Sequence, residues 1–571
     1  MSKFKKVLSL LLSAVLIFAY SSTVIATPSK IKKKPIVVPQ TVNPKLVKNV
    51  IFLIPDGTSI SHITLTRWYN FAKYGKNKLA VDEIATGLVK TYWSDGIITD
   101  SAPAGSAMAT GFKTYNKYIS VLPEKISMPG IPAVKADDIQ KPIATVLEAA
   151  KLAGKSTGLV VTCEIPHATP ASFSSHYYSR SDEYTLVEQQ VYQNIDVVLG
   201  GGLDFLDPAK RKDKEDLLNI LKKRGYQVVT TPEELSNAKS QKLWGLFAPV
   251  NLNRDFDRDP SKQPSLYDMT KKAIEILSKD KDGFFLMVEG SMVDWSSHSN
   301  DPIGVISEFL AFDKAVEYAL NFAKRDKNTL VIVAPDHGNG GLSIGSSESN
   351  SKYDKMPLSD VVDTLTKAKI TATKLYELLN KDMSISEIKT IVGENYGIID
   401  LTDEEANKIL DYLKSPPKGV YFENIVGPMI SKRACIGWTT TGHTGEDVPL
   451  YVYHPRNVRL SGVVQNTDLA KYIAEAMNVS LDSVSKKLFV SAKSIENKVV
   501  SVNIDTTDAN NPVLKITTNS NKIIILPVYK DYAILNNKEI KLSGITICTN
   551  LEKVSDLNYW FFSEDVVKLI K

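Results

Sequence analysis

Short apolar runs alternate with longer amphipathic segments along most of the chain from about residue 47. Each of five runs is a continuous apolar stretch bounded by turn residues, which is typical of a buried, largely parallel strand. The segments between the runs carry apolar residues at helical spacing. This alternation predicts a three-layer α/β/α sandwich with a mostly parallel central sheet. The five runs lie within residues 47–57, 156–165, 282–291, 328–338 and 448–455.

Two regions depart from this alternation. Residues 340–436 contain polar helical segments, so we expect a helical insertion there. Residues 481–571 contain short strand-like runs separated by turn dipeptides, which predicts a small β-rich C-terminal domain. The main domain is then expected to span residues 47–480, and the proline- and lysine-rich residues 27–46 to form a linker.

Residues 1–26 have the make-up of a secretory signal peptide. A lysine-bearing start precedes an apolar run, and Val24 and Ala26 occupy the small-residue positions before a cleavage site. The run is short for a membrane span, so we expect cleavage after Ala26 rather than an uncleaved anchor, and no transmembrane segment in the mature chain. The sequence therefore predicts a secreted or cell-envelope protein.

Composition and charge narrow the range of partners. The chain has 571 residues, of which 43% are hydrophobic and 23% charged, as in a folded soluble protein. Of its formal net charge of +5, Lys3, Lys5 and Lys6 contribute three units within the expected signal peptide. No basic patch interleaved with aromatic residues stands out, so we expect no nucleic-acid specificity. The 3 cysteines are too far apart for a disulfide framework or a CxxC metal site.

Candidate metal ligands gather at the ends of the apolar runs. In an open α/β sheet the ligand lies beyond the carboxyl ends of the strands. One acidic residue or one histidine there would be an ordinary surface or structural residue, but four of the 7 histidines fall at these positions. The candidates are Asp56, Cys163, Glu164, His167, Thr169, Glu289, Asp294, His298, Asp336, His337, His443 and Glu446.

These residue types indicate more than one divalent metal ion. Mixed carboxylate and imidazole ligands suit zinc, whereas carboxylates with a threonine suit magnesium. Two metals about 4 Å apart can clamp the attacking and leaving oxygens of a phosphoryl transfer. A metal can also activate a serine hydroxyl without a histidine base. The pattern therefore favours metal-assisted phosphoryl transfer.

The serine best placed for such a step is Ser101, within TDSAPAGSAMATG. Pro103 suits the first turn of a helix, so Ser101 is expected at a helix N-terminus, where amides and the dipole favour a phosphate. Taken alone, Ser101 is more readily explained as a helix cap. The candidate metal ligands favour a nucleophile instead, whereas Ser106 and Thr110 lie inside the expected helix and are poorer candidates.

Six separated segments resemble, in order and spacing, motifs of the alkaline phosphatases. They are PDG at 55–57, TDSAPAGSAMATGFKTYN at 99–116, HATPASFSSHYYSR at 167–180, VEGSMVDWSSH at 288–298, APDHG at 334–338 and TGHTGED at 441–447. The resemblance covers residues 47–480. It implies hydrolysis of small phosphate monoesters to an alcohol and inorganic phosphate, with broad specificity. Family members are commonly homodimers, which the resemblance implies here too.

The resemblance also implies a role for each site residue. Ser101 would be the nucleophile that becomes a phosphoserine, Asp100 would position the site, and Arg180 would grip two phosphate oxygens. Two zinc ions and one magnesium-type ion are implied, and the second zinc would stabilise the Ser101 alkoxide. The ligands would be Asp294, His298 and His443 for the first zinc, Asp56, Asp336 and His337 for the second, and Asp56, Thr169 and Glu289 for the magnesium-type site.

Two positions depart from the best-known bacterial pattern. His167 stands where that pattern has an aspartate near the magnesium site, and Trp295 stands where it has a lysine that reaches phosphate through water. We expect that His167 can ligate the third metal and shift it towards zinc. Losing the lysine charge at Trp295 is expected to weaken phosphate binding and to speed product release.

Two other functions stay open at this point. One is a phosphodiesterase or sulfatase of the same superfamily, although related diesterases tend to use threonine and SAPAG lacks the arginine of the sulfatase signature. The other is a surface-attached metal- or ligand-binding protein with a dead site. In either case residues 481–571 are candidates for contact with a wall, a glycan or a partner.

Overall fold

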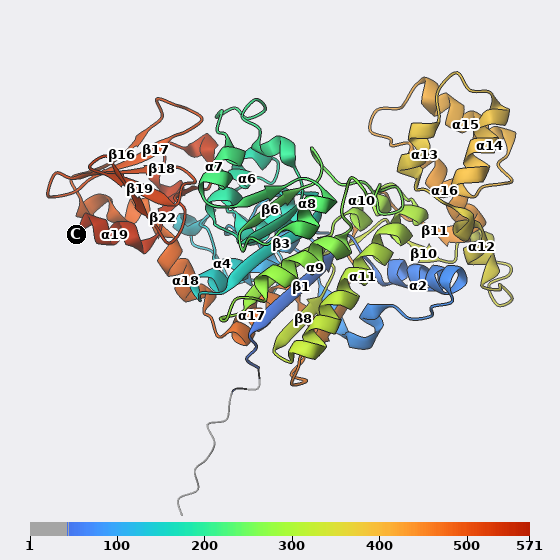
Figure 1. Cartoon of the computed structure of the whole chain (residues 1–571), viewed down its shortest axis with the longest axis horizontal. Helices are drawn as coiled ribbons and strands as arrows, with labels where there is room; N and C mark the ends of the chain where they lie inside the picture. The colour runs from blue at the N-terminus through green and yellow to red at the C-terminus, as the bar shows by residue number, and fades with distance from the viewer. Residues whose placement is uncertain (1–42, 44) are drawn as a thin grey trace, which may run out of the picture. The chain divides into compact units, whose positions relative to one another are not determined.

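The computed structural model describes residue 43 and residues 45–571, and residues 45–571 form one compact unit (Figure 1). At its centre is a ten-stranded sheet. The strands, in spatial order, are β14 (Gly462–Gln465), β2 (Ala85–Lys90), β13 (Val448–Tyr453), β8 (Thr329–Val333), β1 (Asn49–Pro55), β7 (Phe284–Gly290), β3 (Ser156–Glu164), β4 (Val197–Gly201), β6 (Leu243–Leu246) and β5 (Gln227–Val229). From β8 to β5 all neighbours run parallel, whereas β13 is antiparallel to both of its neighbours. The mostly parallel sheet is confirmed.

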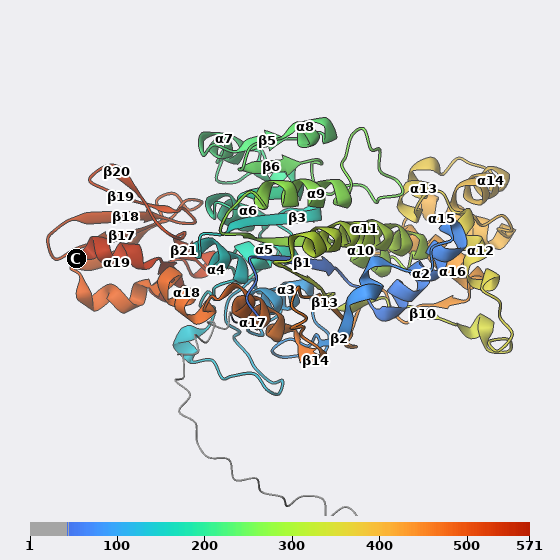
Figure 2. The ribbon, with the colours of Figure 1, turned by 60° about the horizontal axis from the view of Figure 1, so that its bottom comes forward.

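Helices cover both faces of the sheet (Figure 2). Strand β1 shows why: Val50, Phe52 and Ile54 belong to the core on one face. Ile51 and Leu53 belong to the core on the other. Alternate residues of a strand point to opposite faces, so a strand that is apolar throughout must be covered twice. The covering helices include α9 (Leu266–Leu277) and α11 (Pro302–Asp326) on one side and α4 (Val146–Leu152), α5 (Ala168–Ser174) and α17 (Asn466–Met477) on the other. The three-layer sandwich is confirmed.

Residues 340–436, the expected helical insertion, carry five α-helices (on the right in Figure 1). They are α12 (Ser359–Lys367), α13 (Ala372–Leu378), α14 (Ile385–Tyr396), α15 (Asp403–Lys414) and α16 (Glu423–Arg433). Their core also includes Leu65 and Tyr69 of α2 (Ile60–Tyr74) and Ile303 and Ile306 of α11. Two antiparallel pairs join the ends of this segment: β9 (Gly338–Asn339) with β12 (His443–Thr444), and β10 (Ser343–Ile344) with β11 (Ile436–Gly437).

The C-terminal residues form two small antiparallel sheets, which confirms the β-rich character expected there. The five-stranded sheet contains β16 (Ser501–Asp505), β17 (Val513–Thr517), β18 (Ile523–Pro527), β19 (Tyr532–Leu535) and β20 (Lys538–Lys541). The other contains β15 (Val490–Ser491), β22 (Trp560–Phe562) and β21 (Ile547–Cys548). Helix α18 (Leu481–Leu488) lies at the predicted boundary and contributes Leu488 to the core of the main sheet. The boundary at residue 481 stays a prediction.

Buried ion pairs also join the C-terminal segment to the sandwich. The ammonium of Lys530 contacts a carboxylate oxygen of Glu188 and lies 2.6 Å from Oε2 of Glu215. Asp531 accepts from Nη2 of Arg224 at 2.6 Å. The expected signal peptide and nearly all of the expected linker lie outside the described residues. Within the described part, no helix has the length and apolar character needed to cross a membrane.

The substitution Lys530→Met is expected to lower the free energy of unfolding by about 3 kcal/mol, because it leaves the buried carboxylate of Glu188 and the partly buried carboxylate of Glu215 without the ammonium they share. Chemical denaturation measures this loss. Lys541→Met is the control: Lys541 is also paired, with Asp531, but its side chain is 63% exposed, so a loss of at most about 1 kcal/mol is expected. Equal losses in the two variants would contradict this account.

Candidate active site

Ser101 is the first residue of α3 (Ser101–Thr110). The helix cap is Asp100, whose Oδ2 accepts a hydrogen bond from the Ala102 amide at 3.4 Å, so the Ser101 hydroxyl is not used for capping. All residues of α3 are buried. The helix packs on α5 so closely that a Cβ at Gly105 would lie 3.0 Å from Oγ of Ser172. The small residues of this stretch therefore let α3 enter the core with Ser101 at its N-terminus.

Three carboxylates converge at the ends of neighbouring strands. Asp56 follows β1, Glu289 lies near the end of β7, Asp336 follows β8, and β1 lies between the other two strands. All three side chains are fully buried. Both oxygens of Asp56, Oε1 of Glu289 and Oδ2 of Asp336 have no hydrogen-bond partner among the described residues. Buried charges without partners are strongly unfavourable, so this donor set fits cations.

Burial and mutual repulsion shift the ionisation of these groups. Burial, followed by the charges of Asp336 and Asp294, raises the pKa of Asp56 well above its usual value. Burial, followed by Asp336, raises the pKa of Glu289 to about 8. Burial acts on Asp294 in the same direction, but the hydrogen bond and charge of His298 hold its pKa well below the usual value. Without cations, the cluster therefore retains protons that ordinary carboxyls have lost at neutral pH.

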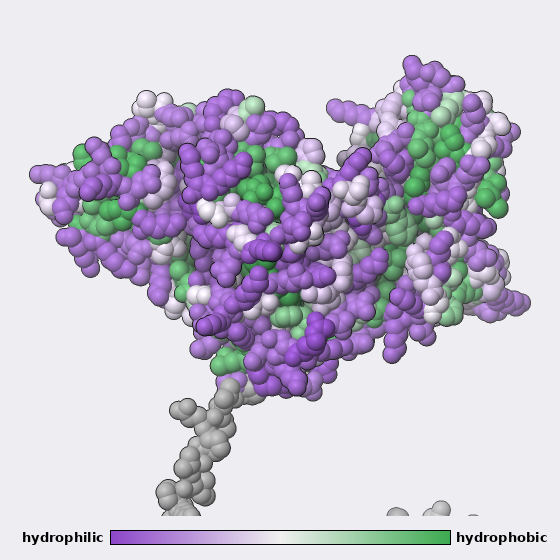
Figure 3. Space-filling model, in the orientation of Figure 1, coloured by the Kyte–Doolittle hydropathy of each residue, from purple (hydrophilic) through white to green (hydrophobic). Residues whose placement is uncertain are grey.

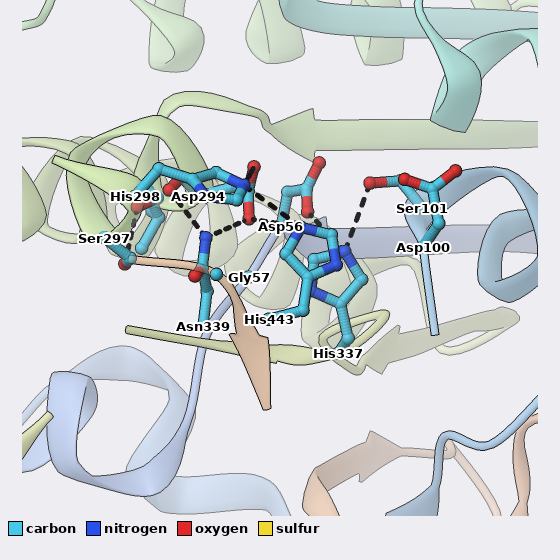
Figure 4. A network of polar contacts seen from close by, with 12 residues as sticks. Asp56, Gly57, Asp100, Ser101, Asp294, Ser297, His298, His337, Asn339 and His443 are labelled. Carbon is cyan, nitrogen blue, oxygen red and sulfur yellow. Dashed lines mark hydrogen bonds and ion pairs between the residues drawn. The ribbon is translucent and has the colours of Figure 1, made fainter. Parts of the chain in front are cut away.

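Three histidines turn the same ring nitrogen towards the carboxylates (Figure 4). Nδ1 lies 2.6 Å from a backbone carbonyl oxygen in His298, 2.8 Å in His443 and 3.2 Å in His337. A carbonyl only accepts, so Nδ1 donates in each ring. Without a metal, Nε2 of His298 carries the proton that it shares with Asp294. Once a ring is neutral, as ligation of a metal requires, Nε2 presents a lone pair. The Nε2 atoms of His298 and His443 are 3.1 Å apart. Two facing lone pairs repel each other, and a cation ligated by both removes that repulsion.

The histidines and carboxylates form two groups of possible metal ligands. In each group, one ligand atom of every member lies within 4.8 Å of the others. The rings of His337 and His443 stack with centroids 3.7 Å apart, which places the groups side by side. Oγ of Ser101 lies 3.1 Å from Nε2 of His337. The groups are Asp294, His298 and His443, and Asp56, Asp336 and His337.

Two features of the backbone hold these groups together. The β9–β12 pairing joins the segments that carry His337 and His443, and it places Asn339 where its Nδ2 donates to Oδ1 of Asp294 at 2.7 Å. Gly57 has a φ of +63°, and a Cβ there would lie 2.4 Å from Oδ1 of Asp294. Only glycine tolerates both conditions. Sequence reasoning missed Asn339, whose one signal was its place two residues after His337.

A third group of possible ligands lies towards β3. Cys163, His167 and Glu289 each offer a ligand atom within 4.8 Å of the others. Sγ of Cys163 donates to Oε2 of Glu289 at 3.6 Å. Oγ1 of Thr169 is buried and has no hydrogen-bond partner in residues 45–571. Cys163 was a strand-end candidate in the sequence, but the resemblance to the alkaline phosphatases assigned it to no ion.

Arg180 lies against this third group. Its Nη1 donates to Oδ1 of Asp100 at 2.6 Å, and its Nη2 donates to Nε2 of His167 at 2.9 Å. A guanidinium only donates, so Nε2 of His167 is unprotonated and Nδ1 carries the ring proton. Burial and the charge of Arg180 lower the pKa of His167 to about 3, which keeps the ring neutral. The ring of Trp295 meets that of His167 edge-on, with centroids 5.9 Å apart.

Two strand-end candidates do not join any of these groups. Glu164 is 6% exposed, and burial raises its pKa to about 7. Oε1 of Glu446 accepts a hydrogen bond from Oγ of Ser59 at 2.5 Å. Neither carboxylate belongs to a ligand group found among the described residues. Proximity in sequence to a strand end was therefore not sufficient to place a side chain in the cluster.

A serine at a helix N-terminus beside clustered carboxylates and imidazoles has the make-up of a metallohydrolase site. A sequence profile of the alkaline phosphatases matches residues 47–479, and the chain belongs to the alkaline phosphatase family. It is 38% identical over 446 residues to alkaline phosphatase 3 of Bacillus subtilis, covering 76% of this chain and 90% of that protein. The chain is therefore a phosphoric monoester hydrolase.

Solved structures agree with this assignment. The crystal structure of Thermus thermophilus alkaline phosphatase matches with a TM-score of 0.67 at 31% identity, covering 76% of this chain and 92% of that one. A mutant of the alkaline phosphatase from the Antarctic bacterium TAB5, in which aspartate replaces a histidine, was solved with Mg bound in its M3 site. That structure matches with a TM-score of 0.53 at 27% identity, covering 76% of this chain and 99% of that one.

Chelator-treated protein is expected to lose stability between about pH 4.5 and about pH 8. The folded-state pKa of Glu289 is raised from 4.5 to about 8, so between these values the folded state holds a proton that the unfolded state has released. The stability contributed by this group is therefore full at acidic pH and is lost as the pH rises through 8. Glu289→Gln should flatten the fall by up to about 1.4 kcal/mol per pH unit.

Thermal unfolding across this pH range measures the slope. Glu446→Gln is the control: although burial opposes it, the hydrogen bond from Ser59 holds the pKa of Glu446 below its usual value. That variant should keep the wild-type slope. Identical slopes in wild type and Glu289→Gln would show that Glu289 does not retain its proton.

Proposed function

We propose that this chain hydrolyses phosphate monoesters through a phosphoserine at Ser101, with two zinc ions and a third, magnesium-type ion. The observation that carries the proposal is the 3.1 Å distance between Oγ of Ser101 and Nε2 of His337, at the edge of two ligand groups. Oγ would form a bond to phosphorus as the ester alcohol leaves. Water would then cleave the phosphoserine and release inorganic phosphate.

The donor sets fit the proposed ions. Each zinc group mixes carboxylate and imidazole, and each imidazole has its Nδ1 held by a carbonyl, which is the form in which histidine ligates zinc. Bound zinc supplies Lewis acidity for the serine and leaving-group oxygens and lowers the pKa of water. The proposed ligands are Asp294, His298 and His443 for one ion and Asp56, Asp336 and His337 for the other.

Arg180 and the N-terminus of α3 would bind the phosphate group. Although burial opposes it, the charge of Arg180 holds the pKa of Asp100 below its usual value, so Asp100 stays ionised and anchors the guanidinium. The planar fork suits two oxygens of a phosphate dianion. Because these groups would contact the phosphate and not the alcohol of the ester, they support broad specificity for the alcohol.

The third ion would be held by Asp56, Thr169 and Glu289. Oxygens of this set are buried without partners among the described residues, and hard oxygen donors suit magnesium. This chain has a histidine, His167, beside the proposed third site. The TAB5 mutant that was solved with Mg in its M3 site has an aspartate in place of a histidine. Ligation through Nδ1 of His167 would require Arg180 to leave Nε2, because a neutral ring has only one lone-pair nitrogen.

Trp295 would affect the release of phosphate rather than the chemical step. Its ring packs against His167, and it carries no charge with which to hold a phosphate. We also propose that the chain is exported, because of residues 1–26, that it forms a homodimer as the resemblance implies, and that residues 481–571 contact a wall, glycan or partner.

Ser101→Ala is expected to lower the turnover of p-nitrophenyl phosphate by about 10³-fold or more, because the nucleophile is lost. Ser106→Ala is the matched control, since Ser106 lies in the same buried helix but its Oγ bonds to the segment at Ser120 and Tyr118. Labelled phosphate should be trapped in acid on wild type and on Ser106→Ala only. Full turnover in Ser101→Ala would overturn the proposed intermediate.

The same assay separates the remaining candidates. A phosphodiesterase would favour bis-p-nitrophenyl phosphate, and a sulfatase would favour p-nitrophenyl sulfate. A binding protein with a dead site would hydrolyse none of the three substrates. We expect the monoester to be favoured over both.

His167→Asp is expected to raise the magnesium content of the purified enzyme to about one ion per chain at the expense of zinc, because a carboxylate replaces an imidazole at the third site. Mass spectrometry of the metals measures this ratio. Glu164→Gln, which changes a nearby buried carboxyl outside the ligand groups, should keep the wild-type ratio. An unchanged ratio in His167→Asp would exclude His167 from control of the third ion.

A further inference from the structure

A cavity of about 570 Å³ lies between the helical insertion and the sandwich. Figure 3 shows the surface hollowed between the lobe of α13–α16 and the sheet-bearing part. Trp295 and His298, both on α10 (Met292–His298), line the cavity together with Arg254, Lys374 and Tyr421. Because His298 belongs to the first ligand group, the cavity opens beside the proposed site of phosphate transfer. The alcohol portion of a bound ester has room to extend there.

Arg254 is the unusual residue of this cavity. The residue is only 9% exposed, and the Nε of its guanidinium is buried without a hydrogen-bond partner among the described residues. No ion pair within residues 45–571 includes it either. A buried guanidinium with unused donors is costly unless a ligand supplies the acceptors.

The carboxylates that surround Arg254 are already bonded to other donors. Asp257 accepts from both the amide and the hydroxyl of Thr371, at 2.9 and 2.5 Å. Asp301 accepts from the Tyr396 hydroxyl at 2.7 Å. Glu308 accepts from the Asp255 amide at 2.7 Å. Burial raises the pKa of all three acids and the charge of Arg254 partly offsets this, so the acids interact with Arg254 only from a distance and leave its hydrogen-bond donors free.

The other charges of the cavity are paired or bonded. Lys374 lies 2.5 Å from Oε2 of Glu377, and both side chains are substantially exposed. Oε1 of Glu423 accepts from the Thr373 hydroxyl at 2.9 Å. Arg254 is therefore the one charged group lining the described cavity whose donors have no partner.

We propose that Arg254 binds a second anionic group, a carboxylate or phosphate, on the alcohol portion of the substrate. The fork of a guanidinium matches either oxyanion. The enzyme would then act on phosphate monoesters in general but prefer those whose leaving alcohol carries a negative charge. The inference rests on the proposed function, since it assumes that the ester phosphate lies at Ser101.

The test compares the phosphate monoesters of 6-hydroxyhexanoate and of 6-hydroxyhexanamide. They differ only in the terminal group, which is a negatively charged carboxylate in the first and a neutral carboxamide of similar size in the second. The flexible chain lets the terminal group reach any part of the cavity, and both alcohols leave equally well. The wild-type kcat/KM should favour the carboxylate by about tenfold, the factor that about 1.4 kcal/mol of binding free energy gives. In Arg254→Gln the ratio should fall to about one through a higher KM, with the amide ester unaffected.

Lys374→Gln is the matched control and should keep the wild-type ratio, because Lys374 is already paired. Arg254→Lys, which keeps the charge, should retain part of the preference. Equal turnover of the two esters by the wild-type enzyme would overturn the inference without any variant. So would an Arg254→Gln enzyme that loses activity on both esters together, which marks a structural role. Failure of the wild type to hydrolyse either ester would instead refute the proposed function.

Discussion

Three carboxylates that are buried side by side determine much of this structure. Asp56, Glu289 and Asp336 come from the ends of three adjacent strands, and four of their oxygens are buried without a hydrogen-bond partner among the described residues. Such a cluster is tolerated only if protons or cations neutralise it. The histidines nearby are each held by a carbonyl at Nδ1, so each turns Nε2 inward as a ligand atom for a cation. Because the apolar strands bury these carboxylates, their negative charge is unfavourable unless cations bind them.

The helical insertion serves the site through its two ends. The β9–β12 pairing closes the insertion and brings His337 and His443 into ring contact across about a hundred residues of chain. The helices of the insertion then form one wall of the cavity that contains Arg254. On the opposite side, the small residues of α3 allow Ser101 to approach the same ligand groups. The β9–β12 pairing and the close packing of α3 are therefore the two features of the fold that bring the site residues together.

Much of the fold and most of the ligand groups could be predicted from the sequence. Continuous apolar runs define buried strands, and parallel strands place their carboxyl ends at one edge, so Asp56, Asp336 and His337 were expected at the same edge of the sheet. The failures have a common cause. The position of Asn339 depends on the β9–β12 pairing, and Arg254 lines a cavity that only the packing of the insertion creates. The tautomers of the histidines depend on carbonyls whose positions no sequence pattern specifies. Glu164 carried the same strand-end signal and lies outside the ligand groups.

The account depends most directly on where metal binds. The decisive measurement is anomalous diffraction at the zinc absorption edge from crystals of the purified enzyme. The account predicts two zinc peaks about 4 Å apart, one among Asp294, His298 and His443 and the other among Asp56, Asp336 and His337 beside Ser101. Zinc bound only elsewhere, or a fully active enzyme with neither position filled, would contradict it.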